Sequence, residues 1–233
     1  MRISYLGPAG TYSEIAALTY ASTGDTFVPQ STLPAAVAAA EQGLSDVAVM
    51  PIENVLEGSV TTTLDLLVHD TALLITAELV VPINHQLLGK PGTDLAQVEV
   101  LYGHPQSLGQ CRQYIDTYLP HVTTIASLSN SAAPAEALAS ARVAVAIGTT
   151  RAAELTGAVV LVPDIQDRAS NVTRFVVLST TDHAPTGDDK TSLCFGFDRE
   201  DRSGQIVKPL QILADAGINI TKFESRPSKA VLG

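Results

Sequence analysis

The chain has 233 residues, of which 45% are hydrophobic and 16% are charged, and its formal net charge is −10. This apolar content is enough to fill a folded core and excludes an intrinsically disordered chain. The acidic balance excludes non-specific binding to nucleic acid and docking on an anionic membrane, because both need a basic face.

The first part of the chain alternates strands and helices. Gly7-Pro8-Ala9-Gly10 interrupts an apolar strand, and Thr11 or Ser13 can cap a helix up to about residue 20. A strand, a glycine-rich turn and a helix N-terminus together are typical of anion-binding sites. Further strands are predicted at residues 27–30, 47–52, 73–81 and 85–88, and helices at residues 34–42 and 62–68.

From residue 98 the same pattern is repeated. Tyr5-Leu6-Gly7 corresponds to Leu101-Tyr102-Gly103, and Val47-Ala48-Val49 to Val143-Ala144-Val145, both at an offset of 96 positions. Strands are predicted at residues 123–127, 143–147 and 159–162, and helices at residues 105–118, 132–140 and 149–155. The repeat predicts a duplicated α/β fold with parallel sheets and helices on both faces. Ligands of such sheets bind at the carboxyl ends of the strands, so two like halves should face one cleft.

The C-terminal part differs in composition from the rest. Residues 181–190 are polar and predict a linker. Beyond it, residues 192–197, 205–216 and 218–224 predict one strand–helix–strand unit, which is too small to be stable alone.

Cysteine, histidine and apolar runs narrow the function classes. Cys111 and Cys194 lie far apart in sequence, so each is expected to be a buried free thiol, and the five histidines show no metal-ligand spacing. No metal and no other cofactor is therefore expected. No run is long enough for a transmembrane helix, and the N-terminus does not resemble a signal peptide, so a cytoplasmic location is expected.

Five short motifs occur in one order along nearly the whole chain. They are Gly7-Pro8-Ala9-Gly10-Thr11-Tyr12-Ser13, Pro51-Ile52-Glu53-Asn54 with Gly58-Ser59-Val60, His104-Pro105-Gln106 with Gln110-Cys111, Asn171-Val172-Thr173-Arg174-Phe175, and Glu224-Ser225-Arg226-Pro227. Together they resemble prephenate dehydratase with its C-terminal ACT regulatory domain.

The resemblance implies the fold and the reaction. The expected fold is α/β, with two Rossmann-like lobes of the type II periplasmic-binding-protein kind, an interlobe cleft and a partial ACT unit. The catalytic domain is expected over residues 1–180, with one lobe at about 1–78 plus 165–180 and the other at about 79–164. A linker at 181–190 and the partial ACT domain at 191–233 follow. The implied reaction is the loss of carbon dioxide and water from prephenate, which gives phenylpyruvate on the route to phenylalanine.

The resemblance also implies roles for individual residues. Thr173 matches an essential threonine of the family, and we expect its hydroxyl to donate a hydrogen bond to the departing oxygen while Glu53 supplies acid–base chemistry. Asn54 and Gln110 match substrate-binding positions. Candidates for binding the substrate carboxylates, from their helix-capping positions, are Thr11, Ser13 and Ser59. Because side chains alternate along a strand, Thr173 and Phe175 should face the cleft, and Arg174 either binds a carboxylate or braces the loop.

Some positions depart from the family pattern. Gly103 replaces a serine before His104, and Val55 replaces a serine after Asn54. An ACT domain is βαββαβ, and this sequence contains only its first half. Phenylalanine is the expected effector, with weak or absent inhibition, and an oligomer, either a homodimer or a homotetramer, is expected because the strands lack partners. The expected effector residues are Gly204, Glu224, Ser225, Arg226 and Pro227.

Two other functions remain open at this point. Arogenate dehydratase carries out the same elimination on the amino analogue of prephenate. A non-catalytic two-lobed protein that binds a small anion or an amino acid would use the same helix N-termini, since a fold does not determine a function.

Overall fold

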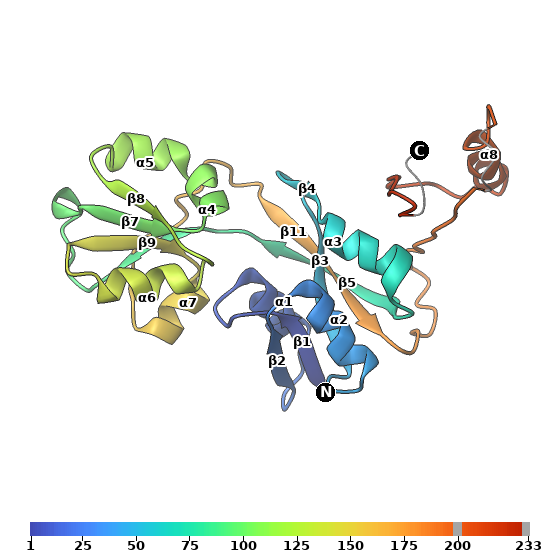
Figure 1. Cartoon of the computed structure of the whole chain (residues 1–233), viewed down its shortest axis with the longest axis horizontal. Helices are drawn as coiled ribbons and strands as arrows, with labels where there is room; N and C mark the ends of the chain where they lie inside the picture. Colours follow the sequence, from blue (N-terminus) through green and yellow to red (C-terminus); the bar gives the residue numbers. More distant parts are fainter. Residues whose placement is uncertain (198–201, 230–233) are drawn as a thin grey trace. The chain divides into compact units, whose positions relative to one another are not determined.

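Two α/β lobes, each built on one mixed sheet, make up residues Met1–Ala184 (Figure 1). The computed structural model describes residues 1–197 and 202–229. A second unit, Pro185–Gly233, follows and is treated separately below.

The first lobe has the strand order β2-β1-β3-β11-β5, and β4 pairs with β3. β1 is parallel to β2 and β3, whereas β11 runs antiparallel to both β3 and β5. Its strands are β1 (Arg2–Leu6), β2 (Thr26–Gln30), β3 (Val47–Asn54), β4 (Gly58–Ser59), β5 (Leu74–Pro82) and β11 (Val172–Ser179). Its helices are α1 (Tyr12–Tyr20), α2 (Leu33–Glu41) and α3 (Thr61–Asp65), which continues as a π-helical turn, Leu66–Asp70.

The second lobe repeats this arrangement, with the strand order β8-β7-β9-β6-β10. β7 is parallel to β8 and β9, and β6 is antiparallel to β9 and β10. Its strands are β6 (Gln86–Gly89), β7 (Val100–Gly103), β8 (Thr123–Ala126), β9 (Ala144–Gly148) and β10 (Val159–Val162). Its helices are α4 (Pro105–Gln110), α5 (Arg112–Tyr118), α6 (Ala132–Ala139), α7 (Thr150–Thr156) and a 3-10 turn, Leu95–Gln97.

Strand pairing supports the predicted duplication. Ser4 pairs with Ala48 in the first lobe, and the residues 96 positions further on, Val100 and Ala144, pair in the second. The expectation of parallel sheets holds only for three neighbouring strands in each sheet, β2-β1-β3 and β8-β7-β9. The antiparallel strands are β5 and β6, between which the chain leaves the first sheet, and β10 and β11, between which it returns.

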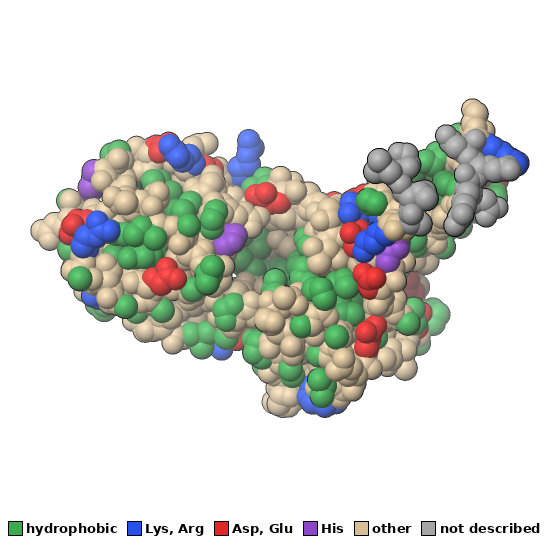
Figure 2. Space-filling view, in the orientation of Figure 1, with side chains coloured by type: hydrophobic (Ala, Val, Ile, Leu, Met, Phe, Trp, Pro, Cys, Tyr) green, Lys and Arg blue, Asp and Glu red, His purple; other side chains and the backbone are tan. Residues whose placement is uncertain are grey.

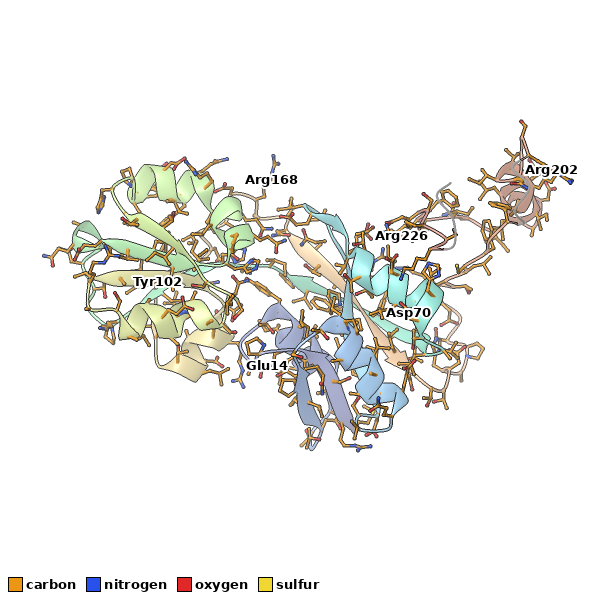
Figure 3. The ribbon with its side chains drawn as sticks, viewed as in Figure 1. Glu14, Asp70, Tyr102, Arg168, Arg202 and Arg226 are labelled. Atoms are coloured by element: carbon orange, nitrogen blue, oxygen red, sulfur yellow. The ribbon has the colours of Figure 1, made fainter. Side chains whose placement is uncertain are left out.

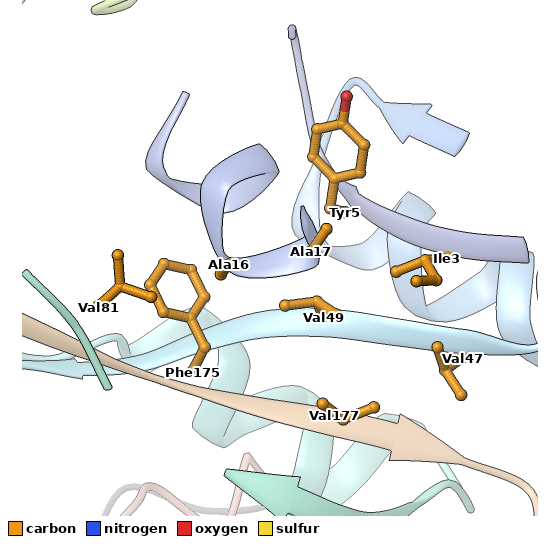
Figure 4. Packing of buried hydrophobic residues seen from close by; sticks show 9 residues of the cluster. All are labelled: Ile3, Tyr5, Ala16, Ala17, Val47, Val49, Val81, Phe175 and Val177. Atoms are coloured by element: carbon orange, nitrogen blue, oxygen red, sulfur yellow. The ribbon is translucent and has the colours of Figure 1, made fainter. Parts of the chain in front are cut away.

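Alternation along the strands places one core on each face of the first sheet. Val47 and Val49 of β3 pack with Phe175 against α1 (Figure 4). Ala48 and Met50 pack on the other face, against α2. Burial of these side chains, each worth about 1.5–3 kcal/mol if it is Val, Met or Phe, holds the helices on the sheet.

The predicted lobe boundary after residue 78 falls inside β5, which stays in the first sheet as far as Pro82. The chain therefore crosses to the second lobe at residues 83–85. It returns through residues 163–171, between β10 and β11.

The predicted C-terminal strands are not formed. Within the described residues of the second unit, α8 (Val207–Asp215) is the one regular element, and residues 192–197 and 218–224 have no strand pairing. The two predicted strands are therefore wrong for these residues, whereas the predicted helix at 205–216 is confirmed by α8. A strand needs a neighbour for its backbone N–H and C=O groups, and the described part of this unit offers none.

Candidate active site between the two lobes

A bulge at the end of β3 determines which side chains face the cleft. Thr173 pairs with Asn54 and Arg174 with Glu53, but Phe175 pairs with Pro51, so Ile52 is the extra residue. Residues directly opposite each other in an antiparallel pair point to the same face. Thr173 and Asn54 therefore share the α1 face of the sheet, which also carries Phe175, as the alternation argument predicted for Thr173 and Phe175.

Hydrogen bonds determine the orientation of the Asn54 amide. Its Oδ1 accepts from the backbone N–H groups of Leu56 and Glu57, at 2.9 and 3.0 Å. Its Nδ2 must then face the opposite way, and it donates to Asn171 Oδ1 at 2.8 Å and to Thr173 Oγ1 at 2.9 Å. The backbone turn after β3 thus orients the side chain that contacts Thr173.

The Thr173 hydroxyl is an acceptor toward Asn54, and this leaves its proton available. Among the described residues, no acceptor lies within hydrogen-bonding distance of that proton. Thr173 as a whole is 9% exposed, so little of the residue contacts solvent. A hydroxyl with its oxygen held and its hydrogen free is a preorganised donor.

The same network reaches the second lobe through Gln110, at the end of α4. Asn171 Nδ2 donates to Gln110 Oε1 at 3.0 Å, and His85 Nε2 lies 2.9 Å from the same oxygen. Gln110 Nε2 donates to Glu57 Oε1, at 3.0 Å, back in the first lobe. Side chains from both lobes are therefore joined in one chain of hydrogen bonds.

A cavity of about 530 Å³ opens beside this network. Gln110, Asn171 and Glu57 line it together with Arg168, an exposed cation on the segment before β11 (Figure 3). Figure 2 shows the surface hollowed between the lobes, with hydrophobic side chains within the hollow. Amide groups and the Arg168 guanidinium line this cavity together with the carboxylates of Glu57 and Asp167, so it is a polar small-molecule site whose uncharged donors are the amides.

Glu53 and Thr173 leave the sheet on opposite faces, so the structure does not bring these two predicted catalytic side chains together, and the catalytic role of Glu53 stays a prediction. The Glu53 carboxylate is bound by the Arg174 guanidinium, which also lies 3.6 Å from a carboxylate oxygen of Glu78, on the other face of the sheet. Ser59 of β4 lies opposite Glu53 in the antiparallel pair, so the Ser59 side chain points to that same face of the sheet. Arg174 is thus part of a bracing ion pair, which was one of its two predicted roles.

Thr11 and Ser13 lie at the start of α1, where another group meets the helix N-terminus. Thr11 caps the helix and donates to backbone oxygens, and Ser13 is 8% exposed. The Glu14 carboxylate accepts from Gly10 N at 2.6 Å and pairs with Arg151 of the second lobe, at 3.4 Å. An internal carboxylate therefore occupies the Gly10 N–H group at this turn, and the Thr11 hydroxyl is directed to backbone oxygens.

This turn also joins the lobes. Thr149 Oγ1, at the start of α7, donates to Gly10 O at 2.7 Å. A Cβ on Gly10 would lie 2.8 Å from Ser131 Cβ and 3.2 Å from Ala152, so a side chain does not fit there. Gly10 has φ +87°, and only glycine adopts this conformation without strain.

Several residues of the site were not singled out from the sequence. Glu57, His85, Tyr12 and Arg168 all contact the network or the cavity. Glu57 lies between the two predicted parts of the second motif, and Tyr12 lies within the first motif, so their positions could have been flagged. His85 and Arg168 lie in crossover segments, whose arrangement depends on both lobes.

Burial shifts two pKa values at this site. Desolvation raises the pKa of the Tyr12 hydroxyl, with a further rise from the thiol of Cys111. Desolvation lowers the pKa of His85, and the hydrogen bond to Gln110 partly offsets that change. Both groups are therefore uncharged near neutral pH.

The described residues contain no group of three or more His, Cys, Asp or Glu side chains placed to hold a metal ion. None of the helices in residues 1–197 and 202–229 is both long and apolar enough to span a bilayer.

The predicted effector residues lie in the second unit. Gly204 adopts φ +82° in the turn before α8, and Glu224 pairs with Lys222 at 3.6 Å. A separate apolar cavity of about 350 Å³ lies between α8 and residues 193–197, where the rings of Phe195 and Phe197 are 5.6 Å apart. None of the five predicted effector residues lines this cavity.

The fold and site together define a two-lobed α/β protein with a polar small-molecule site at the meeting point of its lobes. The family model for prephenate dehydratase matches residues 3–183. The chain belongs to the prephenate dehydratase family.

Named relatives cover nearly the whole chain. A bifunctional chorismate mutase/prephenate dehydratase of Aquifex aeolicus (strain VF5) is 37% identical over 229 residues, which is 98% of this chain and 62% of the relative. Arogenate dehydratase/prephenate dehydratase 1, chloroplastic, of Arabidopsis thaliana is 37% identical over 232 residues, 98% of this chain and 58% of the relative. This chain therefore spans less than two thirds of the length of either relative.

A solved structure has the same fold. The crystal structure of prephenate dehydratase from Arthrobacter aurescens in complex with L-Phe matches with a TM-score of 0.84 at 30% identity, over 98% of this chain and 77% of that one. The two-lobed, periplasmic-binding-protein-like architecture predicted from the sequence is confirmed.

Proposed function

We propose that this chain catalyses the decarboxylating dehydration of prephenate to phenylpyruvate, the step that commits prephenate to phenylalanine. The observation that carries the proposal is the Thr173 hydroxyl, whose oxygen is held by Asn54 and whose proton is free for a leaving group. Family membership over residues 3–183 supports it independently.

The chemistry asks little of the protein beyond orientation and one donor. Prephenate is a dianion with a doubly allylic hydroxyl. As the carbon–carbon bond to the ring carboxylate breaks and carbon dioxide leaves, its electron pair enters the ring. The carbon–oxygen bond then breaks, and the departing hydroxide takes a proton to become water. Thr173 donates a hydrogen bond to that oxygen as its charge develops.

Hydrogen-bond donors at the cavity suit a carboxylate of the substrate. Gln110 Nε2 donates to a carboxylate in this structure, that of Glu57, so its geometry is right for a carboxylate ligand. Arg168 adds a cation beside the same cavity. With Glu53 bound to Arg174 on the other face of the sheet, the proton for the leaving group comes from water in the cavity.

The test is turnover of prephenate by Thr173 variants, followed by the absorbance of phenylpyruvate. We expect Thr173→Val to lose about 10²–10³-fold in kcat, the usual effect of removing one preorganised donor, and Thr173→Ser to keep most of it. Thr124→Val, at an exposed position of β8, is the matched control. Wild-type turnover by Thr173→Val would overturn the assignment.

Arogenate and simple binding are distinguished in the same assay. Incubation with arogenate, followed by phenylalanine formation, tests the related activity that the name of the Arabidopsis relative includes. If wild-type protein binds prephenate and leaves it unchanged, the chain is a binding module and the proposal fails.

The domain assignment and effector site belong to the same proposal. We assign residues 1–180 to catalysis, 181–190 to a linker and 191–233 to regulation, with phenylalanine as the effector at Gly204 and residues 224–227. The Arthrobacter structure, in complex with L-Phe, supports this choice of ligand. Calorimetry of phenylalanine binding to wild type and Arg226→Ala tests it.

Light scattering tests the proposed homodimer or homotetramer, and cell fractionation tests the cytoplasmic location.

A further inference from the structure

His85 lies where the chain crosses from β5 to β6 and is 1% exposed. Its ring packs edge-on against Tyr12, with centroids 5.8 Å apart and planes at 77°. Its Nδ1 lies 3.3 Å from Tyr12 Oη, and its Nε2 lies 2.9 Å from Gln110 Oε1. The ring therefore bridges α1 of the first lobe and α4 of the second.

The partners of His85 decide which nitrogen carries the proton. Gln110 Oε1 is a carbonyl oxygen and can only accept, so His85 Nε2 is the donor. Tyr12 Oη lies 2.7 Å from Asn84 O and 3.3 Å from His85 Nδ1, and its hydroxyl proton can be directed to either acceptor, so Nδ1 needs no proton of its own. Burial favours the neutral imidazole, and its proton is then on Nε2.

Gln110 Oε1 accepts from two donors, so only one of the two orientations of the Gln110 amide is favourable. Gln110 Oε1 accepts from His85 on one side and from Asn171 Nδ2, at 3.0 Å, on the other. Its Nε2 therefore faces the cavity, where Glu57 Oε1 accepts at 3.0 Å. Rotating the amide by 180° would set an N–H group against both donors.

Building on the proposed function, we propose that His85 is a positioning residue: its Nε2–H holds the Gln110 amide so that the Gln110 N–H groups face a substrate carboxylate. His85 does not touch the substrate in this arrangement. It acts through Gln110, at a point where the two lobes meet.

Steady-state kinetics on prephenate with paired variants tests this role. His85→Gln can place an amide nitrogen near the Nε2 position, whereas His85→Asn reaches only to the Nδ1 position. We expect His85→Asn to raise KM about tenfold, the change that one ordinary hydrogen bond makes, with kcat within threefold. His85→Gln should stay within threefold of wild-type KM. Equal KM values for the two variants would overturn the proposal.

A double-mutant cycle with Gln110→Leu shows whether His85 acts through Gln110. We expect the KM of His85→Asn/Gln110→Leu to equal that of Gln110→Leu alone. Multiplying effects would refute the coupling. Thermal unfolding of each variant identifies losses of fold, and His121→Leu, at an exposed loop, is the control for losing a histidine. If wild type does not turn over prephenate, the proposed function fails; if wild type is active and the two His85 variants match it, only this inference fails.

Discussion

Replacing Asn54 by aspartate changes one atom of the hydrogen-bond network and reverses its direction. The remaining Oδ1 still accepts from the backbone N–H groups of Leu56 and Glu57. The second carboxylate oxygen replaces a donor that faces three acceptors: Asn171 Oδ1 at 2.8 Å, Thr173 Oγ1 at 2.9 Å and Val172 O at 3.1 Å. The turn is kept, but the contacts with these three oxygens become unfavourable.

One of these groups can adapt, and this determines the size of the effect. The Thr173 hydroxyl rotates to donate to the new carboxylate, and Val172 O keeps the N–H group of Val55, but the Asn171 amide is held by its bond to Gln110 Oε1, so one buried acceptor, Asn171 Oδ1, is left without a donor. We expect a loss of about 1–3 kcal/mol in the free energy of unfolding. Once the Thr173 proton is bound to the carboxylate it no longer reaches the leaving group, and kcat should fall about 10²–10³-fold.

The pH dependence of the Asn54→Asp variant provides the sharper assay. A carboxyl in this buried position, facing acceptor oxygens, has a raised pKa, and its protonated form can again donate to Thr173. The kcat of the variant relative to wild type should therefore rise as pH falls from about 8 to about 5. Asn219→Asp, at an exposed position of the second unit, controls for the added charge. A kcat for Asn54→Asp equal to wild type at pH 8 would refute the proposed free Thr173 proton.

Three further predictions concern single residues. Glu53→Gln should keep kcat within threefold of wild type and lower the free energy of unfolding by no more than about 1 kcal/mol, because it weakens a partly exposed ion pair with Arg174. A loss of turnover in the phenylpyruvate assay would contradict this. Gly103→Ser should lower the free energy of unfolding by about 1 kcal/mol, because the serine Cβ would lie 3.1 Å from two side-chain atoms of Leu108. The same variant should not have a lower KM. Unchanged stability in denaturant unfolding together with a lower KM would show that the hydroxyl is accommodated. Burial raises the pKa of the Cys111 thiol to about 12, from a value near 9 in the unfolded chain. Between pH 9 and pH 12 the unfolded state therefore binds fewer protons than the folded state, and the free energy of unfolding falls by at most about 1.4 kcal/mol per pH unit. Cys111→Ala should show a shallower dependence of the free energy of unfolding on pH, and an unchanged dependence would contradict the shift.

Much of the fold follows from local sequence. Apolar runs ending in glycine or polar residues predicted the strands and most of the helices of residues 1–184. A buried strand requires apolar side chains, whereas a turn requires glycine or polar residues, so the change in residue type marks the end of the strand. The 96-residue offset predicted equivalent strands, and the pairing of Ser4 with Ala48 and of Val100 with Ala144 shows that the repeat is structural. Thr173, Asn54 and Gln110 were all singled out from the sequence, and the structure joins them through Asn171.

Other features depend on contacts between distant segments. The side of the sheet on which Glu53 lies depends on the bulge at Ile52, and the motif that contains Glu53 does not report that bulge. The role of Glu14 at the start of α1 depends on Arg151, 137 residues away, and no local pattern reports that distance. The C-terminal strands were predicted from apolar periodicity, which measures the tendency to extend and says nothing of whether a neighbouring strand is present.

By itself, the sequence determined which residues form strands, where each strand ends and which polar groups stand at those ends, since these depend on neighbouring residues. Only the tertiary structure decided which polar groups meet. A strand's side chains alternate strictly, and the single extra residue at Ile52 shifts that alternation by one position. Asn54 is thereby turned toward Thr173 and the cleft, and Glu53 toward Arg174 on the opposite face, because the pairing of β3 with β11, more than a hundred residues later, sets the register.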